Sequence, residues 1–246
     1  MKKTTRTRAF AKSLISLAAR PFGTLTHVAT KEPLVALTFD DGPHPESTPR
    51  MVETLEKHGA RGTFFMVGKA AKRHPEVVER VARGGHAIGN HTWDHPSVPL
   101  LRGPARRAQI RWCADALAPH ATKLFRPPYG HQSLGSHIDA LRCGHRPVTW
   151  DVVAEDWAGN DADTLLGQVR ERIDRGSIII FHDALYSTDK EEHRDRGPTI
   201  EAVDRLLAEY GDRYRFVTVP ELLESGSPRH WPWYWKSDLE WLRQLI

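Results

Sequence analysis

Short apolar segments alternate with helix-like patterns along most of this chain. The apolar segments have the length of buried strands and span residues 34–39, 63–67, 86–89, 124–125, 148–152, 178–181 and 216–219. Strands that alternate with helices predict a mostly parallel sheet, and therefore an α/β fold in a single domain. About seven such units in about 195 residues suit a shortened barrel better than an open sheet, although the pattern alone leaves both open.

Two of the intervening segments have clear helix signals. In residues 198–210, Pro198 suits the first helical turn, apolar residues recur at helical spacing, and Gly211 supplies a stop. Residues 75–83 follow the same plan, with Pro75 at the start and Gly84 directly after the end. Both segments are therefore predicted to be helices that pack on the sheet.

The two ends of the chain differ from the rest in composition. We predict a basic N-terminal arm at residues 1–30, a globular domain at 31–226 and an aromatic-rich tail at 227–246. The first twenty residues carry six basic residues and no acidic one, so removing them changes the net charge from +4 to −2. Because the positive charge belongs mainly to the arm, the domain is not expected to bind nucleic acid.

The arm and the tail each allow more than one interpretation. The arm faintly resembles a signal peptide, but Arg20 interrupts its apolar stretch and no small-x-small cleavage site follows. The alternatives are an amphipathic helix on a membrane surface and a solvated tail. Residues 229–246 carry four tryptophans, which predicts packing against the domain or a partner, with sugar stacking or a membrane-interface anchor as the alternatives. Peripheral membrane contact through either end is thus left open, and the expected location is the cytoplasm or its membrane face.

No transmembrane helix is expected, because the sequence has no run of 18 apolar residues. The two cysteines, Cys113 and Cys143, are too few for a disulfide framework, and two free, buried thiols are expected rather than one bridge.

Candidate metal ligands occur directly after two of the predicted strands. Asp40 and Asp41 lie where a strand meets a Gly-Pro turn, and adjacent carboxylates repel unless a cation or an arginine is near. His91 and His95 are four residues apart, which places both on one face if this segment is helical. Two histidines and one carboxylate suit Zn²⁺ or another divalent transition metal rather than Mg²⁺ or Ca²⁺. The alternative is a helix-capping aspartate and two surface histidines.

Three further motifs also follow predicted strands. They are Arg126-Pro127-Pro128-Tyr129-Gly130, the segment 150–157 that ends in Glu155-Asp156-Trp157, and His182 after four apolar residues. Each of them alone has a structural explanation, such as a rigid loop or a histidine in a structural role. Because a barrel brings the carboxyl ends of its strands to one rim, all five motifs together predict an active site.

The five motifs resemble those of the polysaccharide deacetylase family, carbohydrate esterase family 4, which includes nodulation-type chitooligosaccharide deacetylases. In order along residues 34–224 they are TFDDGP at 38–43, HTWDH at 91–95, RPPYG at 126–130, EDW at 155–157 and IIFH at 179–182. The resemblance implies a distorted (β/α)₇ barrel with a metal site at one rim. It also implies a metal-dependent hydrolase of carbon–nitrogen bonds that removes N-acetyl groups from an N-acetylglucosamine-containing poly- or oligosaccharide.

The resemblance also assigns a role to each motif. It makes Asp41, His91 and His95 ligands of one divalent ion, with Zn²⁺ expected and Co²⁺, Ni²⁺ or Mn²⁺ as alternatives. It implies that Asp40 is the general base, that Arg126 orients Asp40 and that His182 is the general acid. It also implies that the Tyr129 backbone N–H binds the oxyanion. Asp156 and Trp157 would contact the substrate, with Trp157 lining the acetyl pocket. No organic cofactor is expected.

One motif departs from the family pattern D-x-x-D-W, in which we expect the first aspartate to pair with the catalytic histidine. Here Val153 occupies that position, and Asp151 lies on the same strand face as a substitute partner. Without a carboxylate partner, the pKa of His182 is expected to be lower. A non-catalytic carbohydrate-binding homologue therefore stays open as an alternative. The basic arm and the aromatic tail leave a second one open, a deformylase or deacetylase of a lipid-linked sugar.

Overall fold

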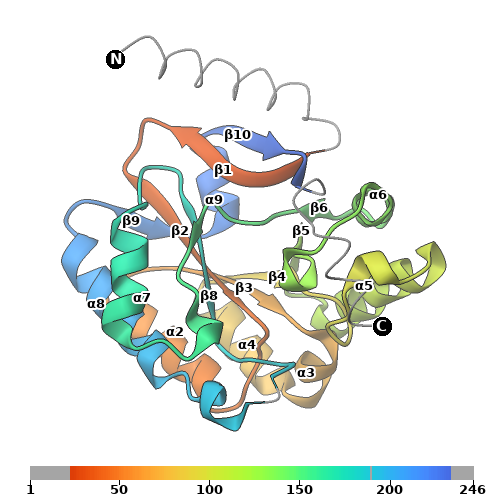
Figure 1. The fold of residues 1–246 in the computed structure, drawn as a ribbon, viewed down its shortest axis with the longest axis horizontal. Helices are drawn as coiled ribbons and strands as arrows, with labels where there is room; N and C mark the ends of the chain where they lie inside the picture. The colour runs from red at the N-terminus through yellow and green to blue at the C-terminus, as the bar shows by residue number, and fades with distance from the viewer. Residues whose placement is uncertain (1–22, 189, 234–246) are drawn as a thin grey trace.

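The computed structural model describes residues 23–188 and 190–233, and its centre is a curled parallel sheet (Figure 1). Its strands are β2 (Leu34–Asp40), β3 (Thr63–Met66), β4 (Ala87–Asn90), β5 (Ala121–Phe125), β6 (Arg146–Pro147), β7 (Val152–Val153), β8 (Ile178–His182) and β9 (Arg215–Val217). The strand order is β6-β5-β4-β3-β2-β8-β7, and β9 also pairs with β2. The prediction of a single α/β domain with a shortened, distorted barrel is confirmed.

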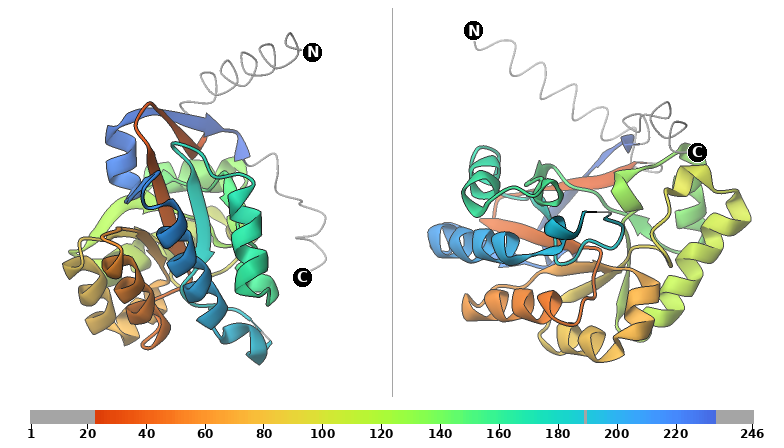
Figure 2. Two further views of the ribbon diagram at one scale, coloured as in Figure 1. Left: turned by 90° about the vertical axis from the view of Figure 1, so that its left-hand side faces the viewer. Right: turned by 60° about the horizontal axis from the view of Figure 1, so that its bottom comes forward.

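Helices surround the outer face of the sheet (Figures 1 and 2). They are α2 (Ser47–Lys57), α3 (Gly68–Arg73), α4 (Pro75–Arg83), α5 (Gly103–Leu117), α6 (Leu134–Arg142), α7 (Ala162–Arg170), α8 (Gly197–Tyr210) and α9 (Val219–Glu224), with short 3-10 turns η1 (Val98–Leu100), η2 (Pro128–Gly130), η3 (Asp156–Ala158) and η4 (Glu191–Arg194). The two helices predicted from their prolines, α4 and α8, are confirmed. In the part of the chain that the structure describes, no helix has the length and apolar character to cross a membrane.

Strand β2 is buried along its whole length because both of its faces are covered. Val35, Leu37 and Phe39 pack into the cluster beneath the helices, where the Phe39 ring stacks on the Phe64 ring at 4.9 Å. Successive side chains of a strand point to opposite faces, so Asp40 lies on the inner face of the curled sheet. The Asp40 carboxylate at the end of β2 therefore points into the interior of the barrel.

A two-stranded antiparallel sheet closes the amino end of the barrel. Strand β1 (Thr24–Thr30) pairs antiparallel with β10 (Gly226–Trp231), so segments interpreted from the sequence as arm and tail lie side by side. Leu25 and Val28 are buried, and the Val28 N–H donates to the Gly176 carbonyl just before β8. The remaining parts of the arm and the tail, 1–22 and 234–246, lie outside the described residues.

Two predicted strands differ from the structure. The segment predicted as one strand at 148–152 belongs to a crossing between β6 and β7, which pair with different edges of the sheet. Its main chain bridges the gap, with Val148 N–H donating to Phe125 and Asp151 N–H donating to Ile178. The strand predicted at 216–219 ends at Val217, because Thr218 forms a capping box with Glu221 and begins α9.

Candidate metal centre and active site

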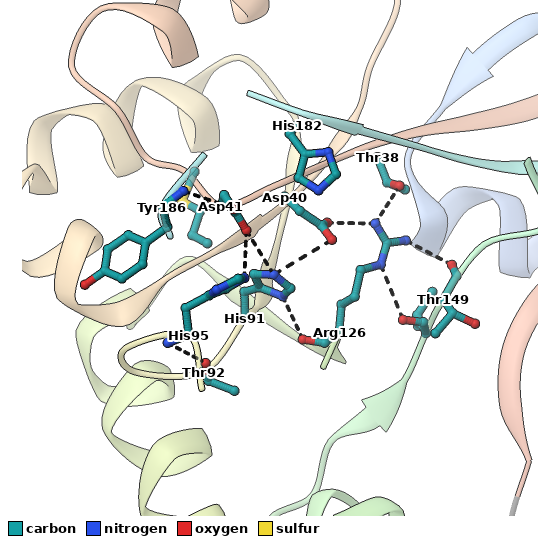
Figure 3. Close-up of polar contacts among 12 residues, drawn as sticks. Thr38, Asp40, Asp41, His91, Thr92, His95, Arg126, Thr149, His182 and Tyr186 are labelled. Atoms are coloured by element: carbon teal, nitrogen blue, oxygen red, sulfur yellow. Dashed lines mark hydrogen bonds and ion pairs between the residues drawn. The ribbon is translucent and has the colours of Figure 1, made fainter. Parts of the chain in front are cut away.

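Asp41, His91 and His95 converge at the carboxyl end of the barrel (Figure 3). One ligand atom from each of the three lies within 4.8 Å of the others, and all three side chains are buried. Asp41 Oδ1 is 2.9 Å from His95 Nε2 and 3.3 Å from His91 Nε2. One carboxylate and two imidazoles arranged in this way suit a divalent transition metal.

Both imidazoles are held so that their Nε2 atoms face Asp41. His91 Nδ1 is 2.7 Å from the Arg126 carbonyl oxygen, and His95 Nδ1 is 3.1 Å from Ser187 Oγ. When Nδ1 carries the hydrogen for these bonds, Nε2 keeps a lone pair for a metal ion. The donor chemistry of these three residues therefore fits a metal ion.

The segment that carries the two histidines is not helical, so the two side chains are not brought together by a shared helix face. Thr92 and His95 have φ values of 69° and 63°, in the left-handed region. Asn90 Oδ1 accepts a hydrogen bond from Thr92 N–H, and Thr92 Oγ1 accepts one from His95 N–H. These side-chain bonds form a tight turn that still brings the two imidazole centroids to 5.0 Å.

The charge on Asp41 is favoured by its histidine neighbours. Burial alone would raise the pKa of this carboxyl, but when the histidines are protonated at Nε2, the positive charge of His95 and hydrogen bonds from both imidazoles lower the pKa well below its usual range. The second oxygen, Oδ2, accepts a hydrogen bond of 2.9 Å from the Tyr186 backbone N–H. Asp41 is thereby fixed as an ionised ligand, and the loop after β8 supports it.

Asp40 is paired with the fully buried Arg126. Nη1 of Arg126 donates to Asp40 Oδ1 at 2.8 Å and to Thr38 Oγ1 at 2.7 Å, while Nη2 donates to the Thr149 carbonyl. The guanidinium also lies 4.1 Å from the centre of the Phe65 ring. These contacts hold one carboxylate oxygen of Asp40, while Oδ2 lies 3.8 Å from His91 Nε2, beside the metal ligands.

His182 pairs with Asp156, at the end of β8. His182 Nδ1 lies 2.8 Å from Asp156 Oδ1, and the His182 backbone N–H donates to Asp156 Oδ2. Burial is the largest single influence and would lower the pKa of His182, but the charge of Asp156, the hydrogen bond that its carboxylate accepts and the charges of Asp41 and Asp40 together outweigh burial and raise this pKa to about 9. The lower pKa expected for His182 without a carboxylate partner therefore does not arise, because Asp156 is that partner.

The aspartate expected to replace the family partner faces elsewhere. Asp151 Oδ2 lies 2.8 Å from His27 Nδ1, and Asp151 Oδ1 accepts from the Ile178 N–H. Asp151 does not reach His182 because the pairing of Val152 with Ile179 places it beside Ile178, four residues before His182. The chain then turns at Glu155, which has a φ of 56°, before Asp156. Asp156 is thus placed behind His182, and it is not among the residues that line the cavity.

A cavity of about 730 Å³ opens over the metal ligands. Tyr129 and Trp157 line it with Trp150 and His182, and the Trp157 ring meets the His182 ring edge-on at 5.4 Å. Tyr129 has a φ of 59°, and its ring meets the His95 ring edge-on at 4.7 Å. The nine side chains predicted for the site therefore gather around this cavity, with Arg126 and Asp156 directly behind its wall.

Several supporting residues were missed by the sequence analysis. Tyr186 and Ser187 hold two of the metal ligands, and Arg196 is buried against Asp156, with Nη1 3.2 Å from the Asp156 carbonyl oxygen. Asp183 is buried behind Gly42, and burial raises the pKa of Asp183 to about 7. The one sequence signal for these residues is the highly charged loop at 183–197, directly after His182, since loops at the rim of a barrel often carry functional residues.

Cys113 and Cys143 are both free, as expected, although Cys143 is only half-buried.

Comparisons with known proteins agree with the motifs. A sequence profile described as "Polysaccharide deacetylase" matches residues 27–148. A peptidoglycan-N-acetylglucosamine deacetylase of Bacillus cereus is 35% identical over 199 residues, which cover 79% of this chain and 70% of the relative. A chitooligosaccharide deacetylase of Azorhizobium caulinodans is 35% identical over 165 residues, which cover 65% of this chain and 79% of the relative.

A solved structure supports the same assignment. The crystal structure of a peptidoglycan N-acetylglucosamine deacetylase matches this fold with a TM-score of 0.76 at 31% identity, covering 86% of this chain and 97% of that one. This chain therefore belongs to the polysaccharide deacetylase family, as its five motifs predict.

Proposed function

We propose that this protein is a metal-dependent N-deacetylase that hydrolyses the acetamide of N-acetylglucosamine units in a poly- or oligosaccharide. The observation that carries the proposal is the arrangement around the cavity. An Asp-His-His metal site, a carboxylate held by Arg126 and a His182–Asp156 pair all meet there. Amide hydrolysis needs an activated water, a proton acceptor and a proton donor, and these groups provide each of them.

Asp41, His91 and His95 are the residues that hold the metal. A bound divalent ion supplies a Lewis acid that lowers the pKa of water and polarises a carbonyl. Zn²⁺ is the proposed ion because two imidazoles and one carboxylate match its preferred ligands, and Co²⁺, Ni²⁺ or Mn²⁺ are the alternatives.

Asp40 is proposed to take the first proton. Its Oδ1 is occupied by Arg126, and its Oδ2 faces the metal ligands, where it can accept the proton of an attacking water. The water oxygen then adds to the acetyl carbon, and the Tyr129 backbone N–H is proposed to stabilise the negative carbonyl oxygen. Asp40 thus acts as the general base.

His182 is proposed to supply the second proton. Its pKa of about 9 keeps the imidazolium form at neutral pH, and its side chain lines the cavity. As the carbon–nitrogen bond breaks, the sugar nitrogen takes this proton and leaves as an amine, while the acetyl group leaves as acetate. With a carboxylate partner present for His182, the main argument for a non-catalytic homologue is removed.

The substrate class is proposed from the relatives and the cavity. The relatives are named for peptidoglycan N-acetylglucosamine and for chitooligosaccharide, both of which carry N-acetylglucosamine. Tyr129, Trp150 and Trp157 give the cavity aromatic surfaces against which a sugar ring can pack. Membrane contact and cellular location stay predictions.

The test is acetate release from chitooligosaccharides and from peptidoglycan fragments. We expect release with added Zn²⁺ or Co²⁺ and none after complete chelation. Asp40→Asn should keep the metal and lose turnover, whereas His91→Ala should lose the metal. Release that survives complete removal of the metal, or full turnover by Asp40→Asn, would contradict this mechanism.

A further inference from the structure

A second hollow, of about 680 Å³, lies outside the catalytic cavity, between α3, the start of α4 and α5. It is lined by Ala71, Lys72, Pro75, Trp93, Trp112 and Asp115, together with Ala116. None of the described residues that line it also lines the catalytic cavity. The proposed chemistry therefore leaves this surface unused.

Trp112 dominates the hollow because its ring is unusually open to solvent. It is 54% exposed, and its ring meets the Trp93 ring edge-on at 6.4 Å and 74°. Trp112 and Asp115 are one helical turn apart on α5, so they share one face of the helix. An exposed tryptophan beside a half-buried one in a hollow is typical of a binding surface, because a large apolar side chain contributes little to folding stability when it is left in water.

Trp93 is held rigidly in this hollow. Its backbone carbonyl accepts from the Lys69 N–H at 2.8 Å, and its N–H donates to Gln109 Oε1 at 3.0 Å. The ring is packed so closely on Gly68 that a Cβ there would lie 2.7 Å from Trp93 Cε3. A fixed aromatic ring binds a ligand without first losing conformational freedom.

The charges in the hollow balance. Lys72 and Asp115 form no ion pair within residues 23–188 and 190–233, and they contribute one charge of each sign. Another hollow, of about 960 Å³, differs because its lining includes Lys123 and Arg146 but no carboxylate. A neutral hollow with an aromatic wall, one ammonium donor and one carboxylate acceptor suits an uncharged, hydroxyl-rich ligand, whereas the other hollow suits an anion.

One loop contributes to both the hollow and the metal centre. Trp93 lies between His91 and His95 in the chain, so the loop that supplies two metal ligands also supplies a wall of the hollow. We infer that this surface, with Trp112 and Trp93 at its centre, binds the sugar rings of an N-acetylated glycan chain outside the catalytic cavity. This inference rests on the proposed function, since a polymer substrate extends beyond the unit that reacts.

The experiment compares binding to an insoluble polymer with turnover of a short soluble one. Wild type and the variants Trp112→Ala, Trp112→Tyr and Leu134→Ala are sedimented with insoluble chitin and with peptidoglycan sacculi. Leu134 is an exposed apolar residue on α6 that lines none of these hollows, so it controls for loss of exposed apolar surface. Acetate release from a short chitooligosaccharide is measured in parallel, with the melting temperature as the control for folding.

Trp112→Ala should bind at least one of the two polymers about tenfold more weakly, because a stacked aromatic surface is lost. Trp112→Tyr should keep most of the binding, Leu134→Ala should bind like wild type, and all four proteins should turn over the short oligosaccharide equally. Sedimentation of Trp112→Ala equal to that of wild type, or failure of wild type to sediment with either polymer, overturns the inference.

Two further outcomes separate this inference from the proposed function. Sedimentation that depends on Trp112, without acetate release from any glycan, would support the sugar-binding surface and contradict the proposed function. Acetate release together with sedimentation that does not depend on Trp112 would support the proposed function and contradict the sugar-binding surface. A wild-type dimer in gel filtration that becomes a monomer in Trp112→Ala would assign the face to a second copy of the chain and overturn the inference.

Discussion

Asp156 holds His182 through both of its carboxylate oxygens. Oδ1 lies 2.8 Å from His182 Nδ1, and Oδ2 accepts the His182 backbone N–H at 2.8 Å. Thr199 Oγ1 also donates to Oδ2, and Arg196 lies behind the same carboxylate. With the carboxylate fixed and Nδ1 occupied, the imidazole can exchange a proton only through Nε2, and its protonated form is favoured.

The first prediction concerns Asp156→Asn and pH. The acid form of His182 is the protonated one, so the rate falls as pH rises through the His182 pKa, which is about 9 in the wild type. In the variant, burial lowers the pKa of His182 and the Asp156 carboxylate no longer opposes this effect. The decrease of kcat at alkaline pH should therefore begin at a lower pH. At neutral pH we expect about 100-fold slower acetate release.

Its measurement is the pH dependence of kcat with the same metal in both proteins, so that the difference between the profiles reports on Asp156. Metal content should stay equal, because Asp156 touches none of the three ligands. An unchanged alkaline limb in the variant would show that Asp156 does not control the protonation of His182.

The second prediction concerns Arg126→Leu. The substitution leaves the Asp40 carboxylate buried without its ion pair and leaves Thr38 Oγ1 without its donor. Removing one partner of a buried pair costs about 3–5 kcal/mol in the free energy of unfolding. Denaturant unfolding measures this loss. The double variant Arg126→Leu/Asp40→Asn should recover part of it, because the unpaired charge is gone, and equal stability of the single and double variants would contradict the argument.

The third prediction concerns Ser187→Ala. This change removes the hydroxyl 3.1 Å from His95 Nδ1 and leaves all three metal ligands in place. Loss of such an outer partner lowers metal affinity about 10- to 100-fold. Zn²⁺ titration against a competing chelator measures the effect, and Thr54→Ala, which changes a hydroxyl on the exposed face of α2, is the matched control. Equal affinity of Ser187→Ala and the control would show that Ser187 does not orient His95.

The site residues found from sequence are those that lie directly at strand ends. Asp40 ends β2, Asp41 directly follows it, and His182 ends β8, so their convergence follows from the parallel sheet alone. The partner of His182 could not be found in this way, because the counting assumed a straight strand beyond Asp151, and the left-handed Glu155 turns the chain. Such a turn has no signal when the residue is not glycine.

The supporting contacts were beyond sequence reasoning because they join distant segments. Tyr186 reaches Asp41 across 145 residues, and Ser187 reaches His95 across 92 residues. The two-stranded sheet of β1 and β10 likewise pairs Thr24 with Trp231, and its strands alternate too weakly to suggest a partner. Hydrophobic periodicity identifies whether a segment is a helix or a strand, whereas contacts between segments far apart in the sequence depend on how the core packs.

The fourth prediction concerns Gly42, which follows the two site aspartates. A Cβ at this position would lie 2.1 Å from Asp183 Oδ2, so Gly42→Ala must displace the Asp183 carboxylate or the turn that carries Asp41. Overpacking of this kind costs about 1–3 kcal/mol in the free energy of unfolding. Because the clash is with one side chain, Asp183→Ala in the same protein should relieve most of it. A double-mutant cycle measures this coupling by denaturant unfolding, and strictly additive effects would show that Asp183 is not the neighbour that requires a glycine here.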